Sequence, residues 1–186
     1  MSLPPKTALI TVGATAPFPA LISASLAPAF LSTLSSLGYT HLLIQHGLTP
    51  TNFGGTPSGQ SLLSSLTNLS TTSPLKITAF DFTPNLSSEI ATSDLIISHA
   101  GSGSILEALR HVKRLVVVPN EDLMDNHQKE LAGELEAQGY LIEGRVDNLP
   151  EAIKKAERAT FKHFPRSGSE VFGRIVEEEL GFEAEG

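Results

Sequence analysis

Two short apolar runs constrain the fold of this chain more than any other feature of its sequence. Residues 94–98 read DLIIS and residues 114–118 read RLVVV. A strand that is apolar along most of its length is typical of a parallel sheet covered on both faces. The segment between the two runs, residues 102–111, reads as a helix. The two runs and this helix therefore predict a strand–helix–strand unit.

The same alternation extends over most of the chain. Further strands are predicted at residues 8–12, 41–45, 75–80 and 140–143, and further helices at residues 19–37, 126–138, 149–160 and 169–180. Strands that alternate with helices predict the α/β class, and right-handed crossovers then give a Rossmann-like, doubly wound parallel sheet. Residues 47–74 are rich in Ser, Thr, Gly, Asn and Pro, so we expect a partly disordered surface excursion there. The expected organisation is a single domain over residues 1–186.

Composition and charge exclude several classes of function. A net charge of −7 argues against non-specific binding to nucleic acid or to an anionic membrane surface. The absence of cysteine excludes disulfides and thiolate chemistry. No signal peptide is evident at the N-terminus. Residues 18–37 are apolar but contain Ser and Pro, so they favour a core helix, and any membrane association is expected to be indirect.

The segment SHAGSGS at residues 98–104 is the sharpest candidate site. In a doubly wound sheet ligands bind beyond the carboxyl ends of the strands, where this segment turns into a helix. Small residues permit close approach of a ligand, and free N–H groups at the helix start favour an anion such as a diphosphate. Glu107 follows about one turn later, where a carboxylate suits a ribose diol. The alternative interpretation is an empty strand-to-helix turn with Ser caps.

Two other strand ends carry weaker signals. Residues 11–15, TVGAT, offer small residues after the first strand but lack the G-x-G-x-x-G pattern. The second strand ends in QHG at residues 45–47, without the acid that a dinucleotide fold uses for ribose, which weakens a nicotinamide interpretation. Residues 122–128, DLMDNHQ, place hydrogen-bonding side chains at a helix start, where they suit sugar hydroxyls; an ordinary capped helix is the alternative.

Two other kinds of site find little support. His99, His111 and His127 lack metal-ligand spacing, so no metal site and no cofactor are expected. Ser102 sits at a strand–helix elbow, yet Ala100 and Ser104 occupy the glycine positions of the G-x-S-x-G hydrolase pattern.

Taken together, the motifs resemble the family of catalytic subunits of the eukaryotic UDP-N-acetylglucosamine transferase that adds the second sugar of the dolichol-linked oligosaccharide. The resemblance rests on GAT-x-PFP-x-L at 13–21, FDF at 80–82, SDLIISHAGSGSILEALR at 93–110 and LMDNHQ-x-ELA at 123–132. It implies a fold equivalent to the C-terminal, donor-binding half of a GT-B glycosyltransferase, similar to the bacterial N-acetylglucosaminyltransferase of the peptidoglycan precursor. It also implies that a separate membrane-anchored subunit binds the acceptor and recruits this chain to the cytosolic face of the endoplasmic reticulum.

The resemblance further implies roles for individual residues. Gly13, Ala14 and Thr15 line the diphosphate side, and the backbone near Phe82 faces the uracil. Gly101, Ser102, Gly103 and Ser104 hold phosphate, with His99 as a further candidate contact, and Glu107 holds the ribose hydroxyls. Asn126, His127 and Gln128 contact the N-acetylglucosamine ring. A last helix at 169–180 helps to dock the partner through the apolar residues Val171, Phe172, Ile175, Val176 and Leu180, or packs on its own sheet.

The implied reaction transfers N-acetylglucosamine from its UDP donor to dolichyl-pyrophosphate-linked N-acetylglucosamine. Charge develops on the departing UDP, and aimed N–H groups and a helix dipole stabilise it. The general base is unassigned, and the partner subunit is one possible source. A non-catalytic regulatory or scaffolding module remains the alternative, and a nicotinamide- or flavin-binding protein is a weaker one.

Overall fold

The computed structural model describes residues 5–13, 17–47, 73, 75–81, 83, 85–120 and 127–165. The strands in these ranges are β1 (Thr7–Thr11), β2 (His41–Gln45), β3 (Lys76–Phe80), β4 (Leu95–His99), β5 (Arg114–Val118) and β6 (Ile142–Glu143). The helices are α1 (Pro19–Ser25), α2 (Pro28–Ser36), α4 (Leu86–Thr92), α5 (Ser102–Arg110), α6 (His127–Ala137) and α7 (Leu149–Arg158). A 3-10 turn, η1 (Val146–Asn148), leads into α7.

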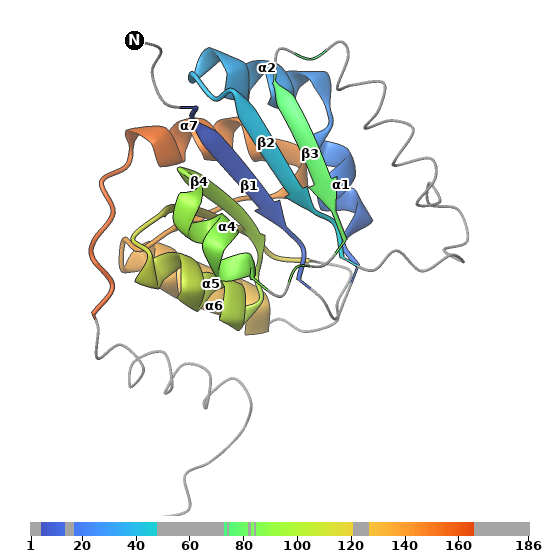
Figure 1. The fold of residues 1–186 in the computed structure, drawn as a ribbon. Helices are drawn as coiled ribbons and strands as arrows, with labels where there is room; N and C mark the ends of the chain where they lie inside the picture. The colour runs from blue at the N-terminus through green and yellow to red at the C-terminus, as the bar shows by residue number, and fades with distance from the viewer. Residues whose placement is uncertain are drawn as a thin grey trace, which may run out of the picture.

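The strands form one sheet in the order β3-β2-β1-β4-β5-β6, and every neighbouring pair is parallel (Figure 1). Ile10 at the centre pairs with Ile44 on one side and Ile97 on the other. The strand order reverses between β1 and β4, which is the place where ligands bind in sheets of this type. The predicted doubly wound parallel sheet is confirmed.

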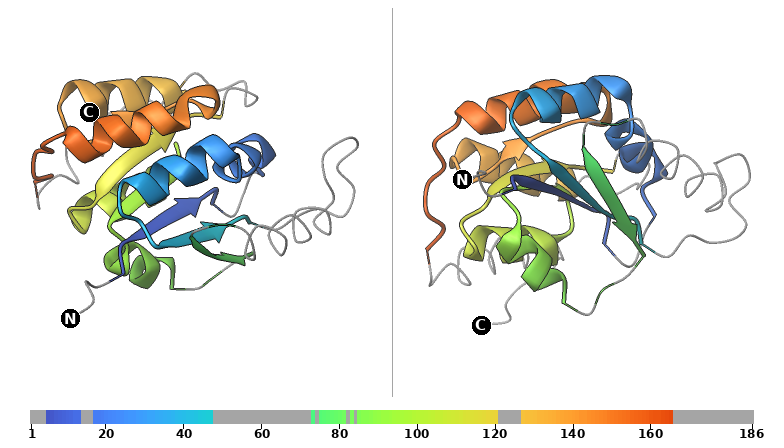
Figure 2. Two further views of the ribbon diagram at one scale, coloured as in Figure 1. Left: turned by 90° about the horizontal axis from the view of Figure 1, so that it is seen from above. Right: turned by 45° about the horizontal axis from the view of Figure 1, so that its top comes forward.

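Helices cover both faces of the sheet, and each face has its own apolar core. Figures 1 and 2 show α1, α2 and α7 on one face and α4, α5 and α6 on the other. Successive residues of one strand serve the two cores: Ile96 packs with α5 and α6, whereas Ile97 packs with α2 and α7. Because side chains alternate along a strand, a strand covered twice must be apolar throughout, and this explains the run DLIIS.

One expectation about helices was wrong, and one helix was not expected. The helix expected at 19–37 is two helices, α1 and α2, that meet at an angle of 56°. Pro28 lies at the start of α2, where a residue without an N–H begins a helix readily but cannot continue one. The helix α4 was not predicted. Among the described helices none alone has the length and apolar composition to cross a membrane, although the bent pair α1 and α2 passes on those two criteria together.

A polar cluster holds α7 to the amino-terminal edge of the sheet. Glu157 of α7 accepts hydrogen bonds from the Tyr39 hydroxyl, at 2.5 Å, and from Lys6 Nζ, at 3.0 Å. The Lys6 ammonium also lies 4.1 Å from the centre of the Tyr39 ring. Burial and the neighbouring Glu157 carboxylate raise the pKa of Tyr39. Burial acts to raise the pKa of Glu157, but the hydrogen bonds from Tyr39 and Lys6 outweigh it, and the pKa is lowered.

Candidate functional site

The loops after β1 and β4 lie side by side at the carboxyl edge of the sheet. Thr11, the last residue of β1, pairs with Gln45 of β2 and with Ser98 of β4. Parallel strands end at one edge, so Gly13 and Gly101 reach the same place from opposite sides of the switch point. The structure therefore brings together two of the three segments that the sequence singled out.

His99 fills the space between these two glycines. A Cβ built on Gly13 would lie 2.5 Å from His99 Cε1, and a Cβ built on Gly101 would collide with the same ring. Gly13 also has a φ of +76°, in the left-handed region that side chains disfavour. Both positions therefore require glycine, and the His99 ring fixes the distance between the two loops.

The His99 ring lies in surroundings that disfavour its charged form. Burial lowers its pKa, and the Thr11 backbone offsets this effect only in part. Its Nδ1 is buried and has no hydrogen-bond partner within the described ranges. Buried ring nitrogens are usually paired, so a ligand hydrogen bond would explain this one.

Gln45 connects the same edge through four hydrogen bonds. Its Oε1 accepts from Thr11 Oγ1 at 2.7 Å and from Gly13 N at 3.1 Å. Its Nε2 donates to Gly13 O at 3.1 Å and to Asp81 O at 2.8 Å. The buried amide thus spends its full capacity on the loops after β1 and β3. A carboxylate at residue 45 could not donate the two hydrogen bonds. Gln45 therefore holds the loops in place and is not suited to bind a ribose.

The start of α5 presents free backbone donors. The first helical hydrogen bond runs from Ile105 N to Gly101 O at 3.1 Å. The N–H groups of Ser102, Gly103 and Ser104 therefore have no acceptor inside the helix. The N-cap residue is glycine and has no side chain to accept from them. Together with the helix dipole, these groups make a turn that is suited to bind an anion.

Glu107 lies further along α5 and faces α4. Its Oε1 accepts a short hydrogen bond from Ser87 Oγ and lies 3.4 Å from His111 Nε2. The side chain is 32% exposed, so the carboxylate is held in place and still open to a ligand.

The third segment is only partly described. Asn120, two residues after β5, is buried. Gln128, in the first turn of α6, has a buried Oε1 without a hydrogen-bond partner in the part of the chain that the structure covers. An unpaired buried amide oxygen is uncommon and is a natural acceptor for a sugar hydroxyl.

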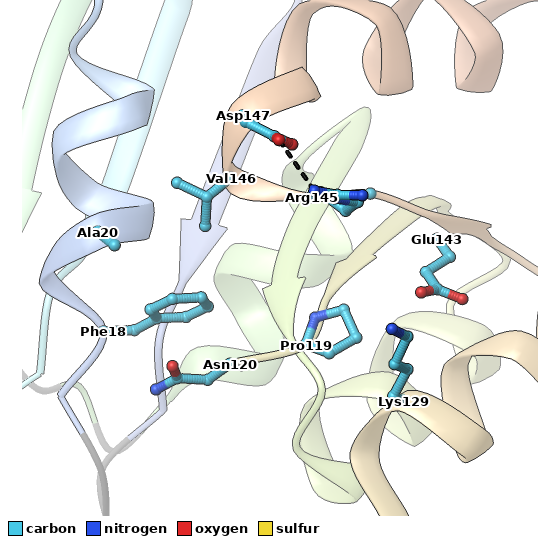
Figure 3. Close-up of a pocket in the computed structure, with 10 residues that line it drawn as sticks. Phe18, Ala20, Pro119, Asn120, Lys129, Glu143, Arg145, Val146 and Asp147 are labelled. Atoms are coloured by element: carbon cyan, nitrogen blue, oxygen red, sulfur yellow. Dashed lines mark hydrogen bonds and ion pairs between the residues drawn. The ribbon is translucent and has the colours of Figure 1, made fainter. Parts of the chain in front are cut away.

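A pocket of about 250 Å³ opens on this side of the sheet edge (Figure 3). Phe18 and Asn120 form part of its wall, and Lys129 of α6 lies across from Glu143. Arg145 forms an ion pair with Asp147 at 3.0 Å on its rim. The pocket combines an aromatic ring with several polar side chains, a mixture that suits a polar ligand such as a sugar ring.

Comparisons with known proteins identify the family. The model of the glycosyltransferase family 28 C-terminal domain matches residues 7–173. The UDP-N-acetylglucosamine transferase subunit ALG13 of Yarrowia lipolytica is 36% identical over 177 residues, which are 94% of this chain and 84% of the relative. The chain belongs to the ALG13 family.

Solved structures agree with this assignment. The solution structure of an ALG13 protein superposes with a TM-score of 0.69 at 30% identity and covers 92% of this chain and 94% of that one. The crystal structure of MurG from Acinetobacter baumannii superposes with a TM-score of 0.59 at 18% identity, over 95% of this chain and 51% of that one, and shows the shared fold alone. As an ALG13-family member, the chain is a glycosyltransferase component with the expected GT-B C-terminal domain fold.

Several predicted site residues of this ALG13-family chain lie outside the described residues. These are Ala14, Thr15, Phe82 and Asn126, the side chain of His127, and the docking residues Val171, Phe172, Ile175, Val176 and Leu180. Most of the excursion expected at 47–74 lies outside as well. The other predicted residues lie within the described ranges. Those that gather at the edge formed by β1, β4 and α5 are Gly13, His99, Gly101, Ser102, Gly103, Ser104 and Glu107, whereas Gln128 lies in the first turn of α6.

Sequence reasoning missed the residues that support this ALG13-family site from neighbouring elements. In the sequence, Gln45 was noted only because no acid occupies that position. Ser87 lies in α4, a helix that was not predicted. Phe18 was noted as part of the PFP motif, but not as a pocket wall. Gln45 and Ser87 reach the site through hydrogen bonds that span 20 to 36 residues of sequence, and local patterns carry no signal for such contacts.

Proposed function

We propose that the chain transfers N-acetylglucosamine from UDP-N-acetylglucosamine to dolichyl-pyrophosphate-linked N-acetylglucosamine. This is the second step of lipid-linked oligosaccharide synthesis for N-glycosylation. The chain acts in complex with a membrane-anchored subunit that binds the acceptor, at the cytosolic face of the endoplasmic reticulum. The names of its relatives support the donor and the need for a partner, because they are called UDP-N-acetylglucosamine transferase subunits.

One observation carries the proposal: an anion-binding turn and a held carboxylate stand on the same helix. The free N–H groups of residues 102–104 suit the diphosphate, and Glu107 follows on the next turns of α5, where the ribose of a nucleoside diphosphate would lie. Gln128 and the pocket beside α6 then suit the sugar.

The proposed chemistry relies on fixed dipoles. Negative charge develops on the β-phosphate as UDP departs. The N–H groups at the start of α5 are held in place by the helix before the reaction, so they can stabilise this charge without rearranging. The unpaired Nδ1 of His99 adds a candidate hydrogen bond to the donor. The acceptor hydroxyl loses its proton to a base that we place on the partner subunit or at the interface.

Glu107→Ala tests the proposal. With charge-assisted hydrogen bonds worth about 1.5–3 kcal/mol each, we expect kcat/KM for UDP-N-acetylglucosamine to fall roughly ten- to a hundredfold. The assay uses membranes that carry the partner but lack this chain. Glu134→Ala is the matched control, because Glu134 is exposed on α6, where its carboxylate accepts a hydrogen bond from Gln138. Unchanged transfer by a folded Glu107→Ala chain would sink the ribose assignment.

A further inference from the structure

We infer that Ser87 and His111 are positioning residues that hold the Glu107 carboxylate in the orientation needed for the ribose of the donor. The inference rests on the proposed function, since it concerns how Glu107 meets a nucleotide. Ser87 lies in the first turn of α4, and His111 directly follows α5.

The number of hydrogens on each side chain fixes which group donates and which accepts among Ser87, His111 and Glu107. The Ser87 hydroxyl has one hydrogen and donates it to Glu107 Oε1. His111 Nε2 lies 3.2 Å from Ser87 Oγ, which then has only lone pairs to offer. His111 Nε2 must therefore carry a hydrogen, and the order is His111 to Ser87 to Glu107.

The contacts fall on one oxygen of the carboxylate. Both Ser87 Oγ and His111 Nε2 approach Oε1 of Glu107. Within the described ranges Oε2 takes part in no hydrogen bond or ion pair, and the Glu107 side chain is 32% exposed. One oxygen is thus fixed by the protein while the other remains free to accept a ribose hydroxyl.

Fixing the carboxylate beforehand has a functional consequence. An unrestrained glutamate samples several rotamers and must be ordered when the nucleotide binds. A glutamate held from α4 is ordered already, so the two helices together define the ribose site. Loss of Ser87 should then weaken interactions with the ribose and leave other contacts of the nucleotide unchanged.

The test compares inhibition of transfer by UDP and by 2′-deoxy-UDP, which lacks one ribose hydroxyl. It uses the full chain in membranes that carry the partner. We expect Ser87→Ala to weaken inhibition by UDP about three- to tenfold and inhibition by 2′-deoxy-UDP by less than about twofold. His111→Phe, which keeps a ring but not the donor, should show the same selectivity, and Ser87→Thr should retain the parent values. Ser88→Ala is the matched control, because Ser88 is exposed on the same helix.

A double variant separates positioning from an independent role. If Ser87 acts through Glu107, adding Ser87→Ala to Glu107→Ala should not weaken inhibition by UDP beyond the effect of Glu107→Ala alone. Equal weakening of both nucleotides by Ser87→Ala and His111→Phe, or full additivity with Glu107→Ala, would overturn the positioning role while the proposed function stands. If Glu107→Ala instead weakens inhibition by UDP and by 2′-deoxy-UDP equally, the ribose assignment is wrong, and this inference fails with it.

Discussion

At the scale of single residues, the most constrained contact is the His99 ring between two glycines. The ring is half-buried and belongs to the last residue of β4, so it has little freedom to move away from an added methyl group. Gly101→Ala should therefore lower the free energy of unfolding by about 1–3 kcal/mol. Gly103→Ala is the matched comparison, because its Cβ would meet nothing within 4 Å and alanine favours a helix, so it should be neutral or stabilising. Urea unfolding of both variants measures this. Equal changes in the free energy of unfolding would contradict the constraint that the His99 ring places on Gly101.

The lowered pKa of His99 predicts a pH dependence of stability. Its folded pKa is below that of the unfolded chain, so the unfolded state binds more protons as pH falls through the unfolded value near 6.5. Stability should decline below that pH by at most about 1.4 kcal/mol per pH unit from this group.

Replacing the ring tests this assignment. His99→Gln should flatten the part of the decline between pH 7.5 and 5.5 in urea unfolding, whereas His163→Gln, at an exposed position, should leave it unchanged. A decline that is identical in the parent and in His99→Gln would mean that His99 is not its source.

Some residues of the candidate site can be recognised from the local sequence, whereas others depend on partners far away in the chain. Gly101 and Glu107 belong to one continuous segment in which small residues, a helix start and an acid are read together, so they could be predicted. The role of Gln45 depends on Thr11, Gly13 and Asp81, which come from other segments of the chain. The contact of Ser87 with Glu107 likewise exists only after α4 packs on α5. Partners from other elements therefore stay invisible to local patterns.

At the scale of elements, strands were predicted more securely than helices. Apolar runs such as RLVVV are determined by burial on both faces, and burial is visible in composition. The break at Pro28 was missed because an apolar stretch of helical length outweighed a single proline. The helix α4, LSSEIAT, buries only Ile90 and carries three Ser or Thr residues, so its sequence resembles a loop.

The polar cluster around Glu157 should contribute measurably to the docking of α7. Glu157→Gln weakens the hydrogen bonds from Tyr39 and Lys6 and should cost about 1–3 kcal/mol of unfolding free energy, because the carboxylate side chain is only 15% exposed. The lowered pKa of Glu157 means that this stability is present above the unfolded carboxyl pKa and is lost as pH falls below it. Glu151→Gln, at an exposed pair with Lys154, should change stability by less than about 0.5 kcal/mol. Thermal unfolding distinguishes the two, and similar effects would contradict the role of the cluster.

At the scale of the whole molecule, the described fold accounts for one half of a transferase. The sheet edge offers groups for a nucleotide, while the acceptor is assigned to a partner. We expect removal of the chain from Ser169 onward to abolish association with membranes that carry the partner, because the predicted helix at 169–180 is proposed to dock there. Sedimentation with such membranes measures this, with membranes that lack the partner as the control. Full association of the truncated chain would discard the docking helix and leave the donor site untouched.

The most direct test of the account is sugar transfer itself. Labelled UDP-N-acetylglucosamine and a lipid-pyrophosphate N-acetylglucosamine acceptor are supplied to membranes that contain the partner but lack this chain, and the purified full chain is then added. The account predicts that a second N-acetylglucosamine is transferred to the lipid only after the addition. A folded, membrane-bound chain that produces no transfer would contradict it and would favour a non-catalytic module.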